Sequence, residues 1–352
     1  MNLARMTGTE IYSRDLISAL CRRAVDHQIT LYCRDPLPQT FAPTASRRVI
    51  GPRRLWTHLG LSLAMARDGP DALFVPAHVV PLIHPAAAVV TIHDLGYLVH
   101  REAYRPADWA YLLISTLWSA RSGRRFLVDS RATARDAQIH LGIPRDKIAV
   151  VYPGVHPAFH HGPHDPPPFG LAPGYLLFVG TLQPRKNLHR LVRAYAAASR
   201  SIAMPPLVLA GAEGHRKKHL DAEIARLRLE SRVLTPGYVS DRDLPALYRN
   251  ARALVFVSLY EGFGIPAAEA MACGLPVITS DRGALAEVVA DAGLLVSPTD
   301  EEAIAAAMVR IQEDGGLRDR MRVEGLIRAG RFTWDAAAQV CLSTIEAALS
   351  DA

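Results

Sequence analysis

Cysteine and lysine are both scarce in this sequence of 352 residues. The four cysteines form no C-x-x-C pair, which argues against a zinc site or a disulfide framework and favours a reducing compartment. Only four of the 40 basic residues are lysines, a ratio that indicates biased genome composition rather than a device for binding polyanions. With 49% hydrophobic and 21% charged residues, the chain can build sizeable cores, and its length favours two domains.

Long apolar runs are also missing. No uncharged run approaches the ~18 residues that a spanning helix needs, and no apolar signal core follows Met1. We therefore expect a cytoplasmic protein, with at most peripheral contact with a membrane at its inner face.

The net charge of +6 belongs to the first half of the chain. Residues 1–165 hold 19 basic and 13 acidic residues, whereas residues 166–352 hold 21 of each. Basic residues do not alternate with aromatic ones on any element, so we expect no nucleic-acid partner. The excess favours a surface that meets anionic lipid or a phosphorylated acceptor, and arginines scattered over a solvated face are the alternative explanation.

Apolar runs of strand length alternate with amphipathic stretches of helix length, which is typical of parallel sheets covered by helices. Strands are predicted near 28–33, 71–75, 87–92, 125–129, 147–152, 175–180, 206–210, 232–236, 253–258, 276–280 and 294–296. Helices are predicted near 9–26, 54–66, 106–122, 130–141, 187–200, 216–229, 241–250, 265–273, 283–290, 300–313, 315–329 and 334–349, the last with Thr333 as N-cap.

A proline-rich stretch over residues 153–174 interrupts this alternation and is predicted to be a linker. The sequence therefore predicts two Rossmann-like domains, 1–165 and 166–333, whose parallel sheets face a central cleft. A C-terminal helix over 334–352 would pack back on the first domain. Ligands of open α/β sheets bind at the carboxyl ends of the strands.

The segment Ser258–Ala272 carries the most informative pattern. A predicted strand ends at Ser258, a loop with Gly262 and Gly264 follows, and a helix begins near Ile265. Free amides at such a helix start, with glycines that permit close approach, form an anion pocket. Glu261 in the loop and Glu269 one turn into the helix suit a ligand with hydroxyl groups at both ends and phosphate between them. Taken alone, either glutamate would be an ordinary residue.

At these residues the chain resembles the retaining glycosyltransferases of family four, which have the two-domain GT-B fold. Their signature is a pair of glutamates separated by seven residues, which Glu261 and Glu269 match. The resemblance covers almost the whole chain. It includes the segments 7–10 (Thr-Gly-Thr-Glu), 91–94 (Thr-Ile-His-Asp), 178–188, 209–211 and 237–241.

The resemblance implies a role for each matching residue. Arg185 and Lys186 would hold the donor diphosphate, and cations fixed there would stabilise the charge that develops on the leaving phosphate. Glu269 would bind the ribose hydroxyls and Glu261 a hydroxyl of the transferred sugar. His93 would lie near that sugar and act in transfer. The remaining donor-binding residues would be Gly8, Thr9, Gly180, Gly211, Tyr238, Val239, Gly262, Phe263, Gly264 and Ile265.

The expected reaction is transfer of a hexose from a nucleotide-diphosphate sugar to a saccharide or lipid-linked acceptor, with retention of configuration. GDP-mannose is the first candidate donor, although the motifs do not separate mannose from glucose, rhamnose or fucose. No metal or other cofactor is expected, because Arg185 and Lys186 supply positive charge and no Asp-x-Asp motif is present.

Two alternatives stay open at this point. One is a GT-B-fold epimerase or phosphorylase, and the other is a non-catalytic or degenerate sugar-nucleotide-binding protein. The second gains weight because only six residues precede Thr7, whereas members of the family usually begin with an apolar strand. The first strand of the first domain is therefore expected to be missing.

Overall fold

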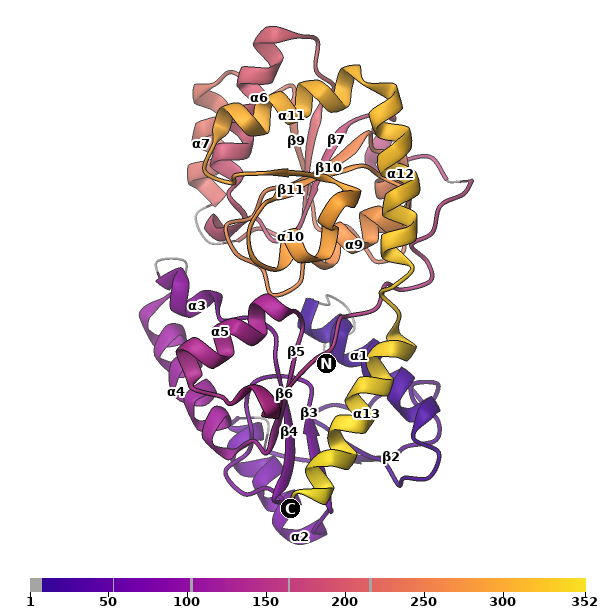
Figure 1. Cartoon of the computed structure of the whole chain (residues 1–352). Helices are drawn as coiled ribbons and strands as arrows, with labels where there is room; N and C mark the ends of the chain where they lie inside the picture. Colours follow the sequence, from indigo (N-terminus) through magenta and orange to yellow (C-terminus); the bar gives the residue numbers. More distant parts are fainter. Residues whose placement is uncertain (1–7, 53, 102–103, 164, 215–216) are drawn as a thin grey trace. The chain divides into compact units, whose positions relative to one another are not determined.

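The structure is a computed structural model. It describes residues 8–52, 54–101, 104–163, 165–214 and 217–352. Its contacts group into two units, Met1–Gly154 with Thr333–Ala352 and Val155–Phe332. Each unit is built from parallel strands and helices (Figure 1), which confirms the predicted α/β class.

The first unit follows the predicted alternation of strands and helices. Its strands are β1 (Thr30–Cys33), β2 (Ser46–Val49), β3 (Ala72–Val75), β4 (Ala87–Ile92), β5 (Arg125–Val128) and β6 (Ile148–Val150). Its helices are α1 (Gly8–Arg23), the π-helix η1 (Trp56–Leu61), α2 (Ser62–Asp68), α3 (Gly96–Val99), α4 (Pro106–Ser122), α5 (Arg131–Leu141), the 3₁₀ turn η3 (Arg145–Lys147) and α13 (Trp334–Ser350).

Two sheets make up the first unit. Strands β3, β4, β5 and β6 pair in that order as a parallel sheet, while β1 pairs only with β2 among the described strands. Every residue of β4 is buried, because helices cover both faces of a central parallel strand. The predicted loss of a first strand concerns residues 1–7, which lie outside the described residues.

The last helix of the chain completes the core of the first unit. Helix α13 packs against α1 and β4, and Trp334 and Ala338 join Tyr12 and Val89 in one buried cluster. The Thr333 side chain accepts a hydrogen bond from the Ala336 amide, which confirms the predicted N-cap. A second cluster on the other face of the sheet packs β4 and β5 against α4 and α5.

The second unit, Val155–Phe332, places all of its described strands in one sheet. Its strands are β7 (Leu176–Val179), β8 (Leu207–Ala210), β9 (Val233–Gly237), β10 (Ala253–Phe256), β11 (Val277–Ser280) and β12 (Leu294–Val296). Its helices are α6 (Leu188–Ser201), α7 (Lys217–Arg226), α8 (Leu244–Asn250), α9 (Ile265–Ala272), α10 (Gly283–Val289), α11 (Glu301–Glu313) and α12 (Gly315–Ala329), with 3₁₀ turns η4 (Pro168–Gly170), η5 (Pro184–Lys186) and η6 (Ala290–Ala292).

All strands of the second unit form one parallel sheet in the order β12-β11-β10-β7-β8-β9. Helices α6, α7 and α11 pack together, as do α9, α10 and α12 (Figure 1). The chain leaves β7 toward β8 and β9, and later returns to the opposite side of β7 to form β10. The neighbouring strands β7 and β10 therefore mark the topological switch point of the sheet.

The structure departs from the predicted elements in a few places. Residues 54–66 were expected to form one helix, but a π-helix precedes α2 there. Strand β2 was not predicted, because its sequence Ser-Arg-Arg-Val is mostly polar. The boundary between the units falls after Gly154 and not after residue 165, because the linker packs on the second unit. There Arg249 donates a hydrogen bond to the Ala158 carbonyl.

Candidate functional site

Two loops meet at the switch point of the second unit. The loop after β7 runs through residues 180–187, and the loop after β10 runs through residues 257–264. Both leave the carboxyl ends of neighbouring parallel strands, where ligands of open α/β sheets bind. The sequence predicted functional residues in each loop, and the topology brings the two loops together.

Opposite charges join these two loops. Lys186 Nζ lies 2.6 Å from Glu261 Oε1, and Arg185 Nη1 lies 3.6 Å from Glu261 Oε2. Arg185 Nη1 also donates a hydrogen bond to the Tyr260 carbonyl at 3.1 Å. The three charged side chains are 8–15% exposed, so water screens them poorly. With two cations and one carboxylate, the cluster keeps one positive charge that can attract an anion.

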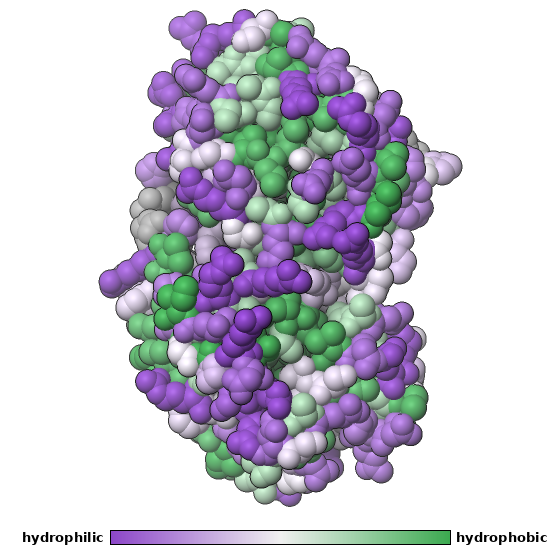
Figure 2. All heavy atoms as spheres, in the orientation of Figure 1, coloured by the Kyte–Doolittle hydropathy of each residue, from purple (hydrophilic) through white to green (hydrophobic). Residues whose placement is uncertain are grey.

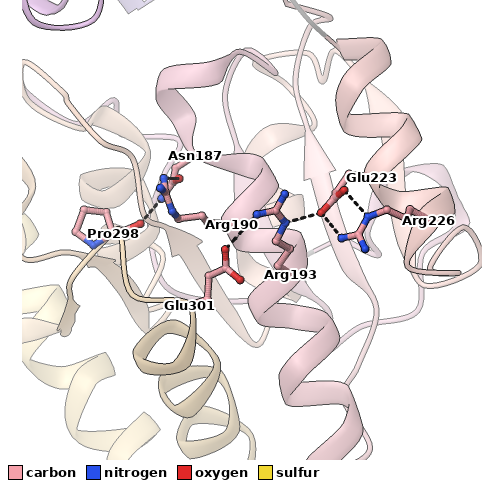
Figure 3. Close-up of polar contacts among 7 residues, drawn as sticks. All are labelled: Asn187, Arg190, Arg193, Glu223, Arg226, Pro298 and Glu301. Atoms are coloured by element: carbon pink, nitrogen blue, oxygen red, sulfur yellow. Dashed lines mark hydrogen bonds and ion pairs between the residues drawn. The ribbon is translucent and has the colours of Figure 1, made fainter.

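Asn187 fixes the loop that carries these cations. Its backbone is left-handed (φ 62°), and its side-chain amide donates hydrogen bonds to Val257 O at 3.0 Å and to Pro298 O at 2.6 Å. Figure 3 shows the bond to Pro298 and the nearby Arg190, which donates to Asn187 Oδ1. The loop is thus tied to the ends of β10 and β12. Sequence reasoning treated Asn187 only as the start of a helix.

The ion pairs in Figure 3 extend away from this anchor along α6. Arg193 and Arg226 both contact Glu223, and Arg193 also lies 3.5 Å from Glu301. Hydrogen bonds from the two arginines hold the pKa of Glu223 low, at about 2. These contacts join α6 to α7 and to α11, so their role is to stabilise the helices behind the loop.

Glycines make close approaches at both loops. A Cβ atom on Gly211 would overlap the carbonyl oxygen of Gly180, so the ends of β7 and β8 leave no room for a side chain there. Gly264, with φ 103°, precedes α9, and a Cβ there would overlap the Leu285 side chain. The structure therefore gives Gly211 and Gly264 packing reasons for being glycine, whether or not a ligand binds.

Glu269 lies inside α9 and is only 6% exposed. Its Oε2 accepts a hydrogen bond of 2.9 Å from the hydroxyl of Tyr248, a fully buried residue of α8 that sequence reasoning missed. Burial and the Glu269 charge raise the pKa of Tyr248 well above its ordinary value, so the phenol stays protonated and donates. The Tyr248 hydroxyl thus helps to hold the Glu269 carboxylate in place.

The other predicted donor residues of this unit follow the strand ends. Gly180 follows β7, while Tyr238, which is 38% exposed, and the buried Val239 follow β9. Gly262 and Phe263 are buried in the loop before α9, and the Phe263 ring packs edge-on against Phe332. Ile265 is the first residue of α9.

The predicted residues of the first unit lie at helix and strand ends. Gly8 and Thr9 form the start of α1, and Thr7 lies outside the described residues. His93 follows β4 and is 9% exposed. Its Nδ1 lies 2.8 Å from Asp129 Oδ2, and its Nε2 lies 2.9 Å from the Pro76 carbonyl oxygen.

These contacts fix the protonation of the His93 ring. A carbonyl oxygen only accepts, so Nε2 must carry a proton and donate it to Pro76. Burial alone would lower the pKa of His93, but the Asp129 carboxylate outweighs burial and raises that pKa. The His93–Asp129 pair therefore holds a proton between Nδ1 and Oδ2 in a site that excludes water.

Asp129 was not among the predicted residues. It follows β5 as His93 follows β4, and these two strands are paired in parallel register, with Ile92 opposite Val128. Asp129 could have been predicted as a site residue from this position, because it and His93 follow neighbouring strands. The ring of Tyr12 packs edge-on against His93 at 4.7 Å, and His78 lies at 6.2 Å. Burial lowers the pKa of His78 to about 4, so this second imidazole is neutral at pH 7.

Within residues 8–52, 54–101, 104–163, 165–214 and 217–352, no group of three or more His, Cys, Asp or Glu side chains is arranged to hold a metal ion. None of the helices described here is both long and apolar enough to cross a membrane.

The two parallel α/β units and the loops at the switch point agree with the GT-B fold, and comparison with known proteins shows that the class is that of the glycosyltransferases. The model for "Glycosyl transferases group 1" matches residues 166–326, and the model for "Glycosyltransferase Family 4" matches residues 6–159. O-antigen chain mannosyltransferase B of Escherichia coli is 34% identical over 256 residues, which cover 70% of this chain and 67% of that protein.

The chain thus belongs to glycosyltransferase family 4, and it is a hexosyltransferase. Further mannosyltransferases of Escherichia coli and Salmonella typhimurium match at 25–27% identity, and the chain spans only 36–63% of their length. It requires a nucleotide-sugar donor and a saccharide acceptor.

Solved structures support the fold. Sucrose-phosphate synthase from Thermosynechococcus elongatus superposes with a TM-score of 0.77 at 22% identity, covering 98% of this chain and 94% of that one. HepE from Anabaena, solved with UDP and glucose, superposes with a TM-score of 0.74 at 19% identity, covering 97% of both chains.

Proposed function

We propose that this protein transfers mannose from GDP-mannose to a saccharide or lipid-linked acceptor, with retention at the anomeric carbon, in polysaccharide or glycoconjugate synthesis. The observation that supports it most is the cluster of Arg185, Lys186 and Glu261 at the switch point of the second unit. The mannosyltransferases among its relatives favour mannose over other hexoses.

In the proposed reaction, the bond between the donor phosphate oxygen and the anomeric carbon breaks, and a bond from the acceptor oxygen forms on the same face. The leaving phosphate takes the acceptor's proton. Arg185 and Lys186 stabilise the negative charge that grows on that phosphate, because fixed cations in a poorly hydrated site need no reorganisation. Glu261 orients Lys186 and accepts from a sugar hydroxyl, so we assign it to donor binding and not to nucleophilic attack.

We assign the remaining residues to matching roles. Glu269, held by Tyr248, binds the ribose hydroxyls, and backbone groups at Tyr238 and Val239 contact the nucleobase. Gly8, Thr9, Gly180, Gly211, Gly262, Phe263, Gly264 and Ile265 admit or contact the sugar and the phosphates. His93, oriented by Asp129, acts in transfer from the first unit. The second unit accordingly carries the donor and the first unit the acceptor, on the cytoplasmic side of a membrane.

A donor screen with the purified chain tests the proposal. GDP-mannose, GDP-fucose, UDP-glucose and dTDP-rhamnose are each incubated with the chain, and release of nucleotide diphosphate is measured for wild type, Glu261→Ala and Lys186→Ala. We expect GDP release from GDP-mannose by the wild type alone. Equal background in all three proteins would instead indicate a non-catalytic binding protein.

Two further readouts examine the chemistry. NMR of the product should show the anomeric configuration of the donor, and an inverted product would overturn retention. Activity should survive EDTA, because Arg185 and Lys186 supply the positive charge at the phosphates. Loss of activity that magnesium restores would contradict that assignment.

A further inference from the structure

Helix α4 presents three large apolar side chains to solvent, although Trp109, Leu112 and Leu113 of the same helix pack against the core of the first unit. Ser115, Thr116 and Ser119 are buried, with Ser119 0% exposed. Tyr111, Ile114 and Trp118 are exposed, with Ile114 69% exposed. Helix α4 is thus apolar on its outer side as well as on its inner side, whereas a surface helix of a water-soluble protein usually keeps its outer side polar.

The buried polar face has partners of its own. Ser119 Oγ donates to the His78 carbonyl at 2.7 Å and accepts from the Val80 amide at 3.0 Å. Ser115 Oγ donates to the Leu112 carbonyl within the helix. The inner face of α4 is thus matched to the loop after β3, and the helix is held in its observed orientation. These hydrogen bonds therefore keep its outer apolar residues at the surface of the first unit.

Neighbouring segments extend this exposed surface. Leu59 of η1 and Leu63 of α2 are four residues apart and share one side of that helix, and the exposed Leu55 directly precedes η1. The His58 ring contacts the Tyr111 ring of α4 at 6.2 Å, which places η1 beside α4.

The loop after β3 connects these helices. Ser119 of α4 binds the Val80 amide, and Ser62 of α2 accepts from the Ile83 amide at 3.2 Å. Exposed residues of this loop therefore lie between α4 and α2. We call the whole surface the apolar face, made of Leu55, Leu59, Leu63, Leu82, Ile83, Tyr111, Ile114 and Trp118. Figure 2 shows apolar atoms at the surface on the left flank of the first unit, where Figure 1 places α3 and α4.

Arginines surround the apolar face. Residues 51–68 and 101–122 contain six arginines and three acidic residues, so half of the net charge of +6 belongs to these two segments. Arg54, Arg101, Arg105 and Arg121 are exposed. Asp68 is paired with Arg67, one of these six arginines, and with Arg48, which lies outside the two segments.

We propose that the apolar face docks the first unit on an anionic lipid bilayer. Leucine and isoleucine side chains would enter the boundary of the acyl chains, Trp118 and Tyr111 would lie at the level of the headgroups, and the arginines would contact lipid phosphate. A second copy of the chain fits less well. A symmetric dimer places the same patch on both subunits, so the arginine rims would oppose each other.

Docking on a bilayer rests on the proposed function in one respect, because a lipid-linked acceptor lies at the surface of a bilayer. Docking does not require the donor residues. Binding to vesicles and hydrolysis of the donor in solution can therefore fail independently, and each result identifies which proposal is wrong.

Co-sedimentation of the full chain with vesicles tests the docking surface. Vesicles of phosphatidylcholine alone and with 30% phosphatidylglycerol are compared at two salt concentrations. The test variant is Ile114→Gln with Trp118→Gln. The matched control is Val323→Gln with Ile327→Gln, which removes two exposed apolar side chains from α12 of the second unit. Circular dichroism and Tm verify that all proteins are folded.

We expect the wild type and the control to bind the anionic vesicles alike, and the test variant to lose at least tenfold in partition coefficient. Arg105→Gln with Arg121→Gln should weaken binding and reduce its dependence on salt. Donor hydrolysis without vesicles should stay within twofold for all variants. Unchanged binding by the test variant, or equal loss in the control, would overturn the proposal. So would a wild-type dimer in solution that the test variant abolishes.

Discussion

The two units of this chain organise charge in different ways. In the second unit, one continuous sheet of six described strands brings Lys186 and Glu261 together at its switch point, 2.6 Å apart. In the first unit, the sheet is divided among the described strands, and its buried charges are the pair His93 and Asp129. Exposed apolar residues gather on the first unit, around α4.

This difference fits the proposed function, in which the second unit binds the donor and the first unit binds the acceptor. A donor with a diphosphate needs fixed cations in a poorly hydrated loop, which the second unit supplies. In the docking that we propose, an acceptor carried by lipid would meet the exposed apolar residues and the arginines of the first unit. The net charge of +6 lies in the first half of the sequence, which holds 19 basic and 13 acidic residues.

The largest expected effect is the loss of a cation in the second unit. Lys186→Ala should lower kcat/KM for transfer by roughly 10²–10³-fold, because the leaving phosphate loses one fixed charge. Lys218→Ala removes the same charge from an exposed position of α7, and should change the rate less than twofold. Initial rates measure both. Similar losses in the two variants would mean that general charge, and not the loop, matters.

A second change tests the close approach of β7 and β8. Gly211→Ala should lower the free energy of unfolding by about 2–3 kcal/mol, since its Cβ would overlap the Gly180 carbonyl. Gly237→Ala meets no atom within 4 Å, so only its φ of 85° strains it, and about 1 kcal/mol is expected. Urea unfolding compares the two. Equal values would show that the strand ends can separate.

The buried pair of the first unit should give a smaller effect that depends on pH. The pKa of His93 is raised in the folded chain, so the stability from the pair is present below its ordinary pKa and is lost as pH rises through the raised value. Asp129→Asn should therefore cost about 2 kcal/mol of unfolding free energy at pH 6 and less at pH 9.

Asp146→Asn is the matched control for that variant, because it neutralises an exposed carboxylate of the same unit. It should change stability by less than about 0.5 kcal/mol at either pH. A cost of Asp129→Asn that is equal at pH 6 and pH 9 would show that His93 does not titrate with the pair.

His78 should give the smallest effect, with the opposite sign. Its pKa is lowered to about 4 by burial, so the folded chain resists protonation that the unfolded chain accepts below its ordinary pKa. Stability should fall as pH decreases from 6.5 toward 4. His78→Gln should make the loss between pH 7 and pH 5 smaller by about 1 kcal/mol, after allowance for partial exposure. Urea unfolding at both pH values measures it, and an unchanged pH dependence would contradict burial as the cause.

Local patterns in the sequence predicted most of the second unit. Apolar runs marked each of its strands, and the loops carrying Arg185, Lys186 and Glu261 followed such runs directly. Local patterns do not give the order of strands in a sheet. The contact between Lys186 and Glu261, which are 75 residues apart, could therefore not be predicted. Tyr248 looked like an ordinary helix residue, because its hydrogen bond to Glu269 joins two helices.

The first unit was harder to predict for the same reason. Asp129 lies 36 residues from His93 and carries no motif of its own, although both follow paired strands. The segment of α4 was predicted as a helix, but which side it buries depends on Ser119 meeting a loop about 40 residues away. Strand β2 carries two arginines and has no apolar run.

Nucleotide binding tests most directly whether the second unit binds the donor. Isothermal titration of GDP and UDP into the full chain, compared with Glu269→Gln and His93→Ala, separates the donor residues of the second unit from the first. We predict that one nucleotide binds the wild type, that Glu269→Gln weakens it at least tenfold, and that His93→Ala leaves it within twofold. No binding by the wild type, or an equal loss in both variants, would contradict the account.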